Sequence, residues 1–547
     1  MPSLKTKDYK NFIINEENVP LSKIIRALPG DEMKLNTSGE WHVKEQSPNH
    51  KLPIVGTLIL NSKYKYGLTS RGVPLYLFTP YNESYPCFIV GSSERDTSKN
   101  RIALIQFDSW PETSKFPRAN LQRILGISGD LKTEAEALYW LYSPQTLNLK
   151  TLVMPTTDGI NQDHRTDICD LPTISIDPPG CKDIDDIISY YKIGSLYTII
   201  VTIADVAETI DEGGPLDIHA RKVGQSLYSG FLPARNMLPA ALSEDALSLL
   251  PDQKRFGVSL FIQWDSENKA ILSSIFKETI VVNKKAHTYD SVYKDTEFPI
   301  NILKDMADIL GSKDINDSHT WIEQLMVYYN KRVAMELADF SCGIFRGQPA
   351  ATIPLLEKYN RWCPHLAHEA AIFTDAENII PHHSLGADIY CYASSPIRRY
   401  VDIVNQRFLK KIIEKRYGFL EEPTLIEEMT ELQKQAKRHG RDEFFLQQLE
   451  AAAVTAATTP ELDGILFECE KSKTAANIWK LKIYILQWRR FIKLSYEGFK
   501  TESGTYVFQK KNTSDIFEIA EEGPIRLTYY YNPNKVGWKR KFVFQPI

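Results

Sequence analysis

The stretch ISIDPPGCKDIDDII, residues 174–188, places four aspartates in an otherwise apolar segment. Clustered carboxylates repel one another, and burying them costs free energy unless positive charge neutralises them. A Pro-Pro-Gly turn separates Asp177 from Asp183, Asp185 and Asp186. A solvated acidic loop is the alternative, but it explains poorly why isoleucines bracket the cluster. The chain must therefore fold so that several carboxylates are neutralised together.

The four aspartates predict a site for hard divalent cations. Strand alternation would put Asp183 and Asp185 on one face and Asp186 on the other, and a bend would be needed to gather them. Carboxylate oxygens are the ligands that Mg²⁺ and Mn²⁺ prefer. Two such ions can activate water and stabilise a leaving oxygen in phosphodiester chemistry. An EF-hand is excluded, because the D-x-[DN]-x-[DN]-G pattern is missing.

The motif SSPIRRY, residues 394–400, supplies the positive charge that such chemistry needs. Arg398 and Arg399 stand at the predicted start of a helix that covers residues 395–413. Arginine can hold a phosphate through two hydrogen bonds, and a helix N-terminus attracts anions. A pair of arginines in surface salt bridges is the alternative interpretation of this motif taken alone.

Both ends of the chain read as β-rich and aromatic. Short apolar runs separated by Gly, Pro, Asn or Ser occupy residues 52–110 and return from Leu462 onwards, a pattern that predicts small barrels. Residues 465–547 hold 15 Lys and Arg against 8 Asp and Glu, although the net charge of the whole chain is −4. Rings interleaved with cations are typical of barrels that bind single-stranded nucleic acid. Ordinary core aromatics and a solvated basic face remain alternatives.

The middle of the chain begins with strands and becomes helical. Helical spacing of apolar residues covers residues 128–144, 320–340, 395–413 and 423–457. With its β-rich ends, the chain is expected to be a multidomain α+β protein. No apolar run reaches the roughly 20 residues of a membrane helix.

Other sequence features exclude several classes of protein. The N-terminus lacks the apolar segment of a secretory signal. The seven cysteines form no C-x-x-C pair, which favours a cytoplasmic or nuclear location. The pairs His365/His368 and His382/His383 have no carboxylate or cysteine at metal-ligand spacing. No Walker motif indicates NTP-driven activity.

The segments SIDPPGCKDIDDIISY and YASSPIRRYVDIVNQR together resemble the two signature stretches of the ribonuclease II/R (RNB-domain) exoribonuclease family, in the same order. The front module GVPLYLFTPYNESYPCFIVGSS resembles the cold-shock domain of the exosome-associated eukaryotic branch, and the tail resembles the family's C-terminal OB-type domain. The resemblance covers roughly residues 52–547.

The resemblance implies a role for each matched residue. Asp177, Asp183 and Asp186 would hold Mg²⁺ (or Mn²⁺, and two ions), and Asp185 would be the carboxylate most needed for chemistry. Arg398 would contact the scissile or the adjacent phosphate and stabilise its transition-state charge, and Arg399 would support it. Tyr228 falls where the family has an aromatic residue that packs on the 3′-terminal base.

The resemblance also implies a domain order. An N-terminal extension, either a reduced barrel or a partly disordered arm, would cover residues 1–50. A cold-shock-type OB domain (51–127), a helical linker (128–170), a catalytic domain with a mixed sheet and helices (171–460) and a C-terminal OB-type barrel (461–547) would follow. No endonuclease-like domain precedes them, so tethering to an exosome is not expected.

The chain departs from the family pattern at several positions. Gln406, Tyr392 and Gln348 stand where the family often has histidine. The interval between the aspartates and Arg398 is also shorter than is typical, which indicates a trimmed catalytic domain. Because of these departures, the resemblance does not define the depth and shape of the RNA channel.

The sequence therefore predicts a monomeric, cytoplasmic or nuclear 3′-to-5′ exoribonuclease. It would degrade single-stranded RNA to nucleoside monophosphates with Mg²⁺, away from membranes. A catalytically impaired RNA-binding protein with the same core is the first alternative, and a two-metal nucleotidyltransferase is the second.

Overall fold

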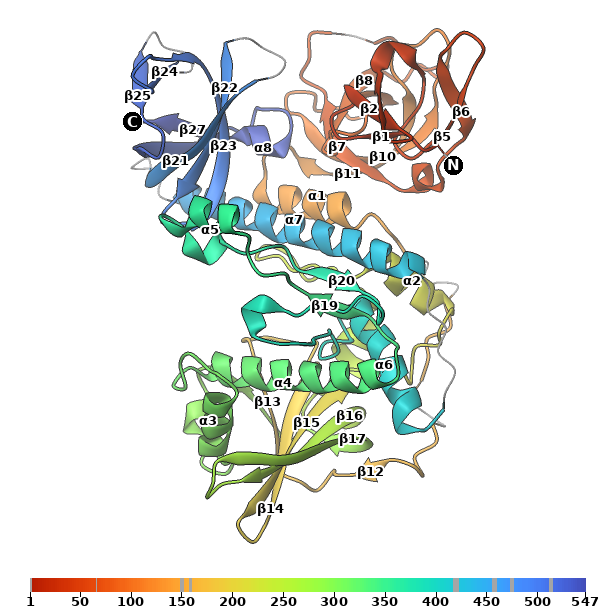
Figure 1. The fold of residues 1–547 in the computed structure, drawn as a ribbon. Helices are drawn as coiled ribbons and strands as arrows, with labels where there is room; N and C mark the ends of the chain where they lie inside the picture. Colours follow the sequence, from red (N-terminus) through yellow and green to blue (C-terminus); the bar gives the residue numbers. More distant parts are fainter. Residues whose placement is uncertain are drawn as a thin grey trace. The chain divides into compact units, whose positions relative to one another are not determined.

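A computed structural model describes residues 2–64, 66–147, 152–156, 160–416, 423–454, 460–472, 477–510 and 515–547. The chain forms two compact units. The first contains residues 1–145, 229–233 and 438–547, and the second contains residues 146–228 and 234–437. The predicted α+β class is confirmed, because β-rich regions at both ends of the chain flank a middle region in which a mixed sheet is followed mainly by helices (Figure 1).

The first unit contains the predicted barrel at residues 51–127. Five strands close it in the order β10-β11-β9-β8-β7. Along β8, Tyr76 and Phe78 are buried while Leu75 and Leu77 are partly exposed, so side chains alternate as the pleat requires. The strands are β7 (Ile54–Ile59), β8 (Leu75–Pro80), β9 (Phe88–Gly91), β10 (Arg101–Ser109) and β11 (Arg118–Ile127).

Residues 2–50, expected as a reduced barrel or a partly disordered arm, are folded into two three-stranded sheets. Their own small core contains Leu4, Phe12, Ile14 and Met33, all fully buried. The sheets have the orders β1-β2-β3 and β4-β6-β5. The strands are β1 (Lys5–Thr6), β2 (Asn11–Ile14), β3 (Glu17–Pro20), β4 (Ile24–Ile25), β5 (Glu32–Leu35) and β6 (Trp41–Glu45).

The C-terminal region of the first unit is a seven-stranded antiparallel sheet of order β25-β24-β23-β22-β21-β26-β27, the counterpart of the predicted second barrel. Helix α1 (Leu131–Tyr142) lies in the predicted linker and is capped by Asp130, whose side chain accepts from Thr133 N. The strands are β21 (Glu461–Lys471), β22 (Ile478–Ile485), β23 (Arg490–Lys500), β24 (Tyr506–Gln509), β25 (Ile516–Ile519), β26 (Pro524–Tyr531) and β27 (Phe542–Pro546), with the short helix α8 (Trp538–Lys541).

The second unit is built on a mixed seven-stranded sheet of order β12-β17-β16-β15-β14-β13-β18. The pairs β12–β17 and β13–β18 are parallel, and the others are antiparallel. The strands are β12 (Thr166–Asp167), β13 (Thr173–Asp177), β14 (Asp186–Ile193), β15 (Leu196–Ala204), β16 (Lys254–Asp265), β17 (Ala270–Val282) and β18 (Lys285–Thr288).

The second unit also contains the helices α2 (Pro215–Val223), α3 (Ile300–Ile309), α4 (Ser318–Asp339), α5 (Ile353–Asn360) and α6 (Tyr400–Ile413), and a hairpin that pairs β19 (Phe345–Gly347) with β20 (Ile372–Thr374). Helix α7 (Pro423–Val454) belongs to the second unit as far as Lys437 and to the first from Arg438. The predicted helix over residues 423–457 is one helix as far as Val454, and residues 455–457 lie outside the described part, as do residues 157–159 of the expected linker. Within the described residues, no helix is long and apolar enough to cross a membrane.

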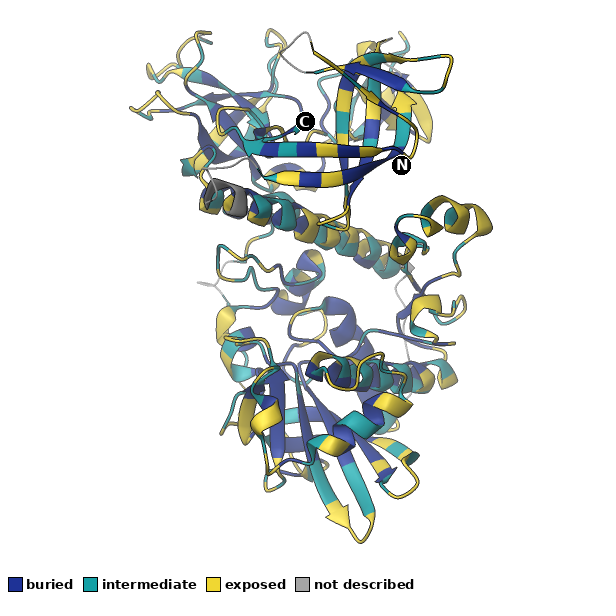
Figure 2. Ribbon diagram, turned by 90° about the vertical axis from the view of Figure 1, so that its left-hand side faces the viewer, coloured by how far each residue is buried: buried dark blue, intermediate teal, exposed yellow. Residues whose placement is uncertain are grey.

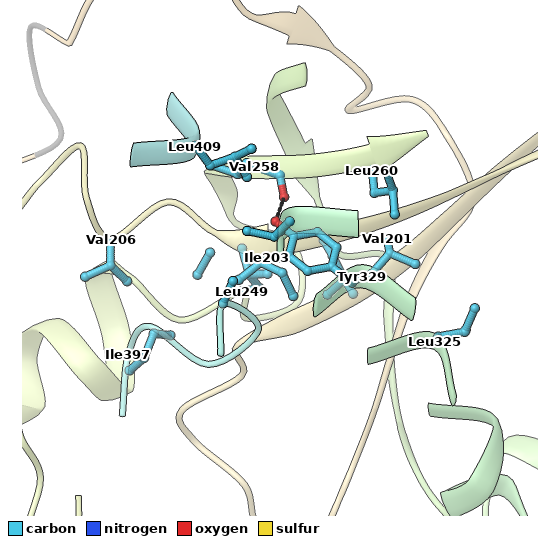
Figure 3. Packing of buried hydrophobic residues seen from close by; sticks show 14 of the residues in the cluster. Val201, Ile203, Val206, Leu249, Val258, Leu260, Leu325, Tyr329, Ile397 and Leu409 are labelled. Carbon is cyan, nitrogen blue, oxygen red and sulfur yellow. Dashed lines mark hydrogen bonds between the residues drawn. The ribbon is translucent and has the colours of Figure 1, made fainter. Parts of the chain in front are cut away.

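The core of the second unit joins the sheet to α4 and α6. Strands β15 and β16 are mostly buried (Figure 2). Figure 3 shows Tyr329 of α4 among Val201, Ile203 and Val258, with its hydroxyl donating to the carbonyl of Val258 at 3.1 Å. Ile397 and Leu409 belong to the same cluster, so the segment that carries Arg398 is anchored in the core.

A buried ion cluster ties α6 to the sheet. Lys410 Nζ lies 2.7 Å from Asp205 Oδ2 and 3.1 Å from Glu278 Oε2. Arg165 NH2 contacts the same two carboxylates at 2.8 and 3.0 Å, and both cations also contact Glu208. Removing one partner from such a cluster leaves uncompensated buried charge, which is costly.

We expect Lys410→Met to lower the free energy of unfolding of the second unit by about 3–5 kcal/mol. The adjacent Lys411→Met is the matched control. Its amine lies 3.8 Å from Glu212 at the surface and should contribute less than about 1 kcal/mol. Urea denaturation of both variants measures the difference, and equal midpoints would contradict a role for the cluster.

Candidate active site

The four aspartates lie in and beside the loop that connects two neighbouring strands. Asp177 ends β13, and Asp186 begins β14. These strands are antiparallel, with Ile174 opposite Ile188, so the end of β13 and the start of β14 lie next to each other at the base of the loop. Asp183 and Asp185 lie within the loop, so the expected strand alternation does not hold for them. The loop, rather than the pleat, sets where their carboxylates lie.

Hydrogen bonds from other segments fix the loop backbone. The hydroxyl of Ser248 donates to the carbonyl of Lys182 at 2.7 Å and accepts from the N–H of Ile184 at 2.9 Å. Leu249 N donates to the carbonyl of Ile184, and Ala204 N donates to the carbonyl of Asp185. Ser248 was not predicted, because no motif links it to residues 182–184.

Arg398 and Asp185 meet across 213 residues of sequence. Arg398 Nε donates to Asp185 Oδ2 at 2.9 Å, and the backbone N–H of Ile397 donates to Asp185 Oδ1 at 2.9 Å. Arg398 NH2 also donates to the hydroxyl of Ser395 at 3.0 Å. The chain between the aspartate motif and the arginine motif was expected to be short for the family, and it nevertheless brings Asp185 and Arg398 into contact.

The arginine turn is held by Asp402, which accepts from Ser395 N at 2.8 Å and from Arg399 NH2 at 2.7 Å. Helix α6 begins at Tyr400, five residues later than predicted, because Arg399 is extended (φ −135°, ψ 127°). In extended backbone, successive side chains point to opposite faces. Arg398 thus contacts the aspartate loop, and Arg399 contacts Asp402 and Tyr392. The Cζ of Arg399 lies 4.3 Å from the centre of the Tyr392 ring.

The carboxylates of Asp177, Asp185 and Asp186 are largely buried, and too little positive charge lies near them to offset the effect of burial on their pKa values. Burial raises the pKa of Asp177 to about 6, and burial with the charges of Asp177 and Asp185 raises the pKa of Asp186 to about 8. Burial also raises the pKa of Asp185 to about 6, although Arg398 and the N–H of Ile397 oppose this shift. One arginine does not neutralise the group, so a further cation would stabilise the ionised form.

Asp183 is covered by Tyr228, whose hydroxyl donates to Asp183 Oδ2. The thiol of Cys181 lies 3.7 Å from Asp183 Oδ1. Tyr228 is 44% exposed as a residue, so part of it is open to a ligand. The structure thus places Tyr228 beside Asp183 through a hydroxyl contact that the sequence did not predict.

The ligand atoms that the four aspartates offer are of the type that hard cations prefer. All four side chains offer carboxylate oxygens, and Asp177 Oδ2 is buried without a hydrogen-bond partner. Among the described residues, three ligand atoms lie within 4.8 Å of one another in two groups, Asp205/Glu208/Glu278 and His164/Glu278/Glu414. Neither includes an aspartate of the loop, and Lys410 and Arg165 already contact Glu278.

Gln406 and Gln348, which were expected to stand where the family often has histidine, both form hydrogen bonds with nearby backbone groups. Gln406 accepts from Ala207 N and donates to the carbonyl of Ala204. Ala204 is the last residue of β15, and its N–H donates to the carbonyl of Asp185. Gln348 donates to the carbonyl of Glu369 and accepts from Ser384 N. Neither contact involves the aspartate loop.

Comparison with known proteins agrees with this fold. Residues 165–297 and 368–415 match the RNB domain family, and residues 75–143 match the Dis3-like cold-shock domain 2. The chain thus has an RNB domain preceded by a Dis3-like cold-shock domain, and the predicted resemblance to the ribonuclease II/R family is confirmed.

Individual relatives are distant. The exosome complex exonuclease RRP44 homolog A of Arabidopsis thaliana is 24% identical over 457 residues, which cover 66% of this chain and 48% of that protein. The chain spans about half the length of the curated relatives it matches.

Solved structures share the fold over the whole chain. Mycoplasma genitalium RNase R, solved with ribose-methylated single-stranded RNA, has a TM-score of 0.74 at 17% identity, covering 100% of both chains. Yeast Ssd1, described as a pseudonuclease, has a TM-score of 0.66 at 13% identity, covering 100% of this chain and 96% of that one.

We expect Ser248→Ala to lower the free energy of unfolding by about 1–3 kcal/mol, because it leaves the Lys182 carbonyl and the Ile184 N–H without their partner. The matched control is Ser273→Ala, whose hydroxyl contacts Gln263 at the surface. Thermal unfolding of both variants measures the effect. A Ser248→Ala protein as stable as the control would show that the loop does not depend on this hydroxyl.

Proposed function

We propose that this protein is a metal-dependent 3′-to-5′ exoribonuclease that hydrolyses single-stranded RNA to nucleoside 5′-monophosphates. The observation that carries the proposal is the contact between Arg398 and Asp185, which sets a phosphate-binding cation beside a cluster of underneutralised carboxylates. Acidic side chains that bind hard cations and an adjacent arginine are the parts that phosphodiester hydrolysis needs.

Asp177, Asp183 and Asp186 would hold Mg²⁺, with Mn²⁺ as the alternative and two ions as the expected number. The bound cations would supply an activated water and stabilise the leaving oxygen. The orphaned Oδ2 of Asp177 and the raised pKa values of Asp177 and Asp186 support this assignment.

Arg398 would contact the scissile phosphate. Its Nε and one terminal nitrogen are held by Asp185 and Ser395, which fixes the plane of the guanidinium. Its side chain remains 45% exposed, so the rest of the group can reach a ligand. Asp185 would position this arginine and the attacking water, because its two oxygens are fixed by Ile397 N and Arg398 Nε.

Tyr228, which is partly exposed, would pack its ring against the 3′-terminal base while its hydroxyl stays on Asp183. Arg399 would support the arginine turn through Asp402. The barrels, rich in rings and cations, would bind single-stranded RNA by stacking and phosphate contacts, with little dependence on sequence. We expect a monomer in the cytoplasm or nucleus.

The rival proposal is an RNA-binding protein that has lost catalysis. The likeness to the pseudonuclease Ssd1 favours it, and so does the absence of any loop aspartate from the tight three-ligand groups of the described residues. The intact set of four aspartates with Arg398 favours the enzyme. Activity assays separate the two.

We expect Asp185→Asn to lower nucleotide release by about a hundredfold or more, because the neutral amide no longer fixes Arg398 or the attacking water. RNA affinity should stay within a few-fold, since binding rests on many other contacts. The control is Asp305→Asn on the surface of α3, which contacts Lys269. Nucleotide release by a clean Asp185→Asn preparation at the wild-type rate would overturn the mechanism.

Removal of divalent cations should stop the reaction. With excess EDTA, 5′-labelled RNA should stay full length, and adding Mg²⁺ should restore shortening. A gel-shift assay should show that RNA still binds. RNA that binds but is never shortened, with or without Mg²⁺, would instead support the rival protein without catalysis.

A further inference from the structure

The backbone that leads to Tyr228 is paired with the arginine turn. Ser226 N donates to the carbonyl of Arg398 at 2.9 Å, and Tyr400 N donates to the carbonyl of Gly224 at 2.9 Å. These two hydrogen bonds tie the chain just before Tyr228 to the turn that carries Arg398.

Residues 228–234 form a loop, the Tyr228 loop, which leaves this paired segment and returns to it. Leu227 N donates to the carbonyl of Arg235 at 3.0 Å, and Arg235 N donates to the carbonyl of Leu227 at 2.8 Å, so the base of the loop is closed. Tyr228 belongs to the second unit, whereas residues 229–233 belong to the first. Any group that holds the residue after Tyr228 therefore bears directly on where the tyrosine side chain lies.

A single carboxylate of α7 holds the start of the Tyr228 loop. Glu443 Oε1 accepts from the hydroxyl of Ser229 at 2.8 Å and from the N–H of Gly230 at 2.9 Å. The hydroxyl of Ser229 also accepts from Phe231 N at 3.1 Å. Hydrogen bonds to an ionised carboxylate are stronger than those between neutral groups, so Glu443 can fix two consecutive residues. Glu443 and residues 229–233 all belong to the first unit.

Glu443 has few other contacts that could explain its burial. It is 5% exposed, and its Oε2 atom has no hydrogen-bond partner. Gln447 Nε2 approaches Oε1 at 3.5 Å, and no cation forms an ion pair with Glu443 among the residues that the structure describes. The adjacent Asp442, by contrast, lies 3.3 Å from Arg441 and accepts from the hydroxyl of Tyr142. A buried carboxylate is costly without partners, so Glu443 depends on the donors of the Tyr228 loop.

The far end of the Tyr228 loop is anchored as well. Phe231 and Leu232 pack against an apolar cluster that includes Leu446 of α7. The hydroxyl of Tyr139 donates to the carbonyl of Pro233 at 3.1 Å. The tip of the loop is therefore held on both sides.

We propose that Glu443 is a positioning residue, which holds Tyr228 beside Asp183 by fixing the two residues that follow the tyrosine. Only Tyr228 and Ser229 lie between the closed base of the loop and the fixed N–H of Gly230, and each residue has just two soft backbone torsions. Glu443 acts through this turn and not on the reacting atoms. The role of Tyr228 at the 3′-terminal base rests on the proposed function, whereas the position of its side chain does not.

The first measurement reports on Tyr228 without RNA or catalysis. A fluorotyrosine at position 228 alone gives one ¹⁹F NMR resonance, whose shift depends on the hydroxyl contact with Asp183 and on the surroundings of the ring. Glu443→Met should shift or broaden this resonance by more than its linewidth, because the turn loses both hydrogen bonds to the carboxylate. Glu443→Gln should leave the resonance close to its wild-type position, since the amide oxygen can still accept both.

The second measurement reports on the terminal base. Fluorescence anisotropy compares a single-stranded RNA with the same RNA lacking its 3′-terminal base, in the Asp185→Asn background so that cleavage is slow. The intact RNA should bind roughly tenfold more tightly, as stacking of a base on an aromatic ring predicts. Tyr228→Ala and Glu443→Met should each reduce this preference to about threefold or less, and the double variant should lose no more than Tyr228→Ala alone.

Tyr142→Phe is the matched control. It removes the hydroxyl that donates to the buried Asp442, the residue next to Glu443, and so takes a hydrogen bond from a buried carboxylate without touching the Tyr228 loop. The melting temperature should fall in both Tyr142→Phe and Glu443→Met. Tyr142→Phe should nevertheless keep the wild-type resonance and the preference for the terminal base. Ser229→Ala, a milder loss at the other end of the contact, should move the resonance in the same direction as Glu443→Met but by less.

An unchanged ¹⁹F resonance in Glu443→Met, or an equal change in Tyr142→Phe, would overturn the proposal, because the effect would then be absent or one of stability alone. If Glu443→Met does not fold, an unchanged resonance in Ser229→Ala overturns it in the same way. If the resonance moves as expected but the parent protein shows no preference for the terminal base, Glu443 still positions Tyr228. The part of the proposed function that sets Tyr228 against the RNA would then be wrong.

Discussion

The contact between Arg398 and Asp185 is the interaction on which the proposed chemistry depends. It joins a loop between two strands to a turn 213 residues later. Asp185 is 3% exposed; its Oδ2 accepts from Arg398 Nε, and its Oδ1 accepts from the backbone N–H of Ile397. Without the arginine, the ionised form of the buried Asp185 would be costly, since it would be an unpaired buried charge. The remaining carboxylates then lie around an already fixed ion pair.

The rest of the second unit can be understood as support for this contact. Ile397 anchors the arginine turn in the core, and Asp402 fixes its backbone from the first turn of α6. The cluster around Lys410 holds α6 against the sheet, and Ser248 fixes the aspartate loop. Ile397 and Asp402 act on residues close to them in sequence, whereas Ser248 and Lys410 act on segments that are remote in sequence.

Much of the site could be predicted from sequence because its chemistry is local. Four aspartates in an apolar segment and adjacent arginines after a Ser-Ser-Pro turn are visible without a structure. The partners of these residues were not visible, because Ser248 contacts the loop across more than sixty residues and no short pattern records that distance.

The fold was predicted well where patterns are long and less well where they are short. The closed barrel and the long helices α4 and α7 follow from alternation and helical spacing. The strands of residues 2–50 have two to five residues each, so their alternation is too brief to distinguish from irregular chain. Helix α6 began later than predicted because the arginine turn is fixed by tertiary hydrogen bonds, which override local propensity.

The most direct measurement follows two labels on one single-stranded RNA incubated with the wild-type protein and Mg²⁺. A 3′-terminal label should appear as a mononucleotide from the first time point, while a 5′-terminal label should pass through progressively shorter products. Release of the 5′ label first, cleavage within the chain, or an intact RNA would contradict the account.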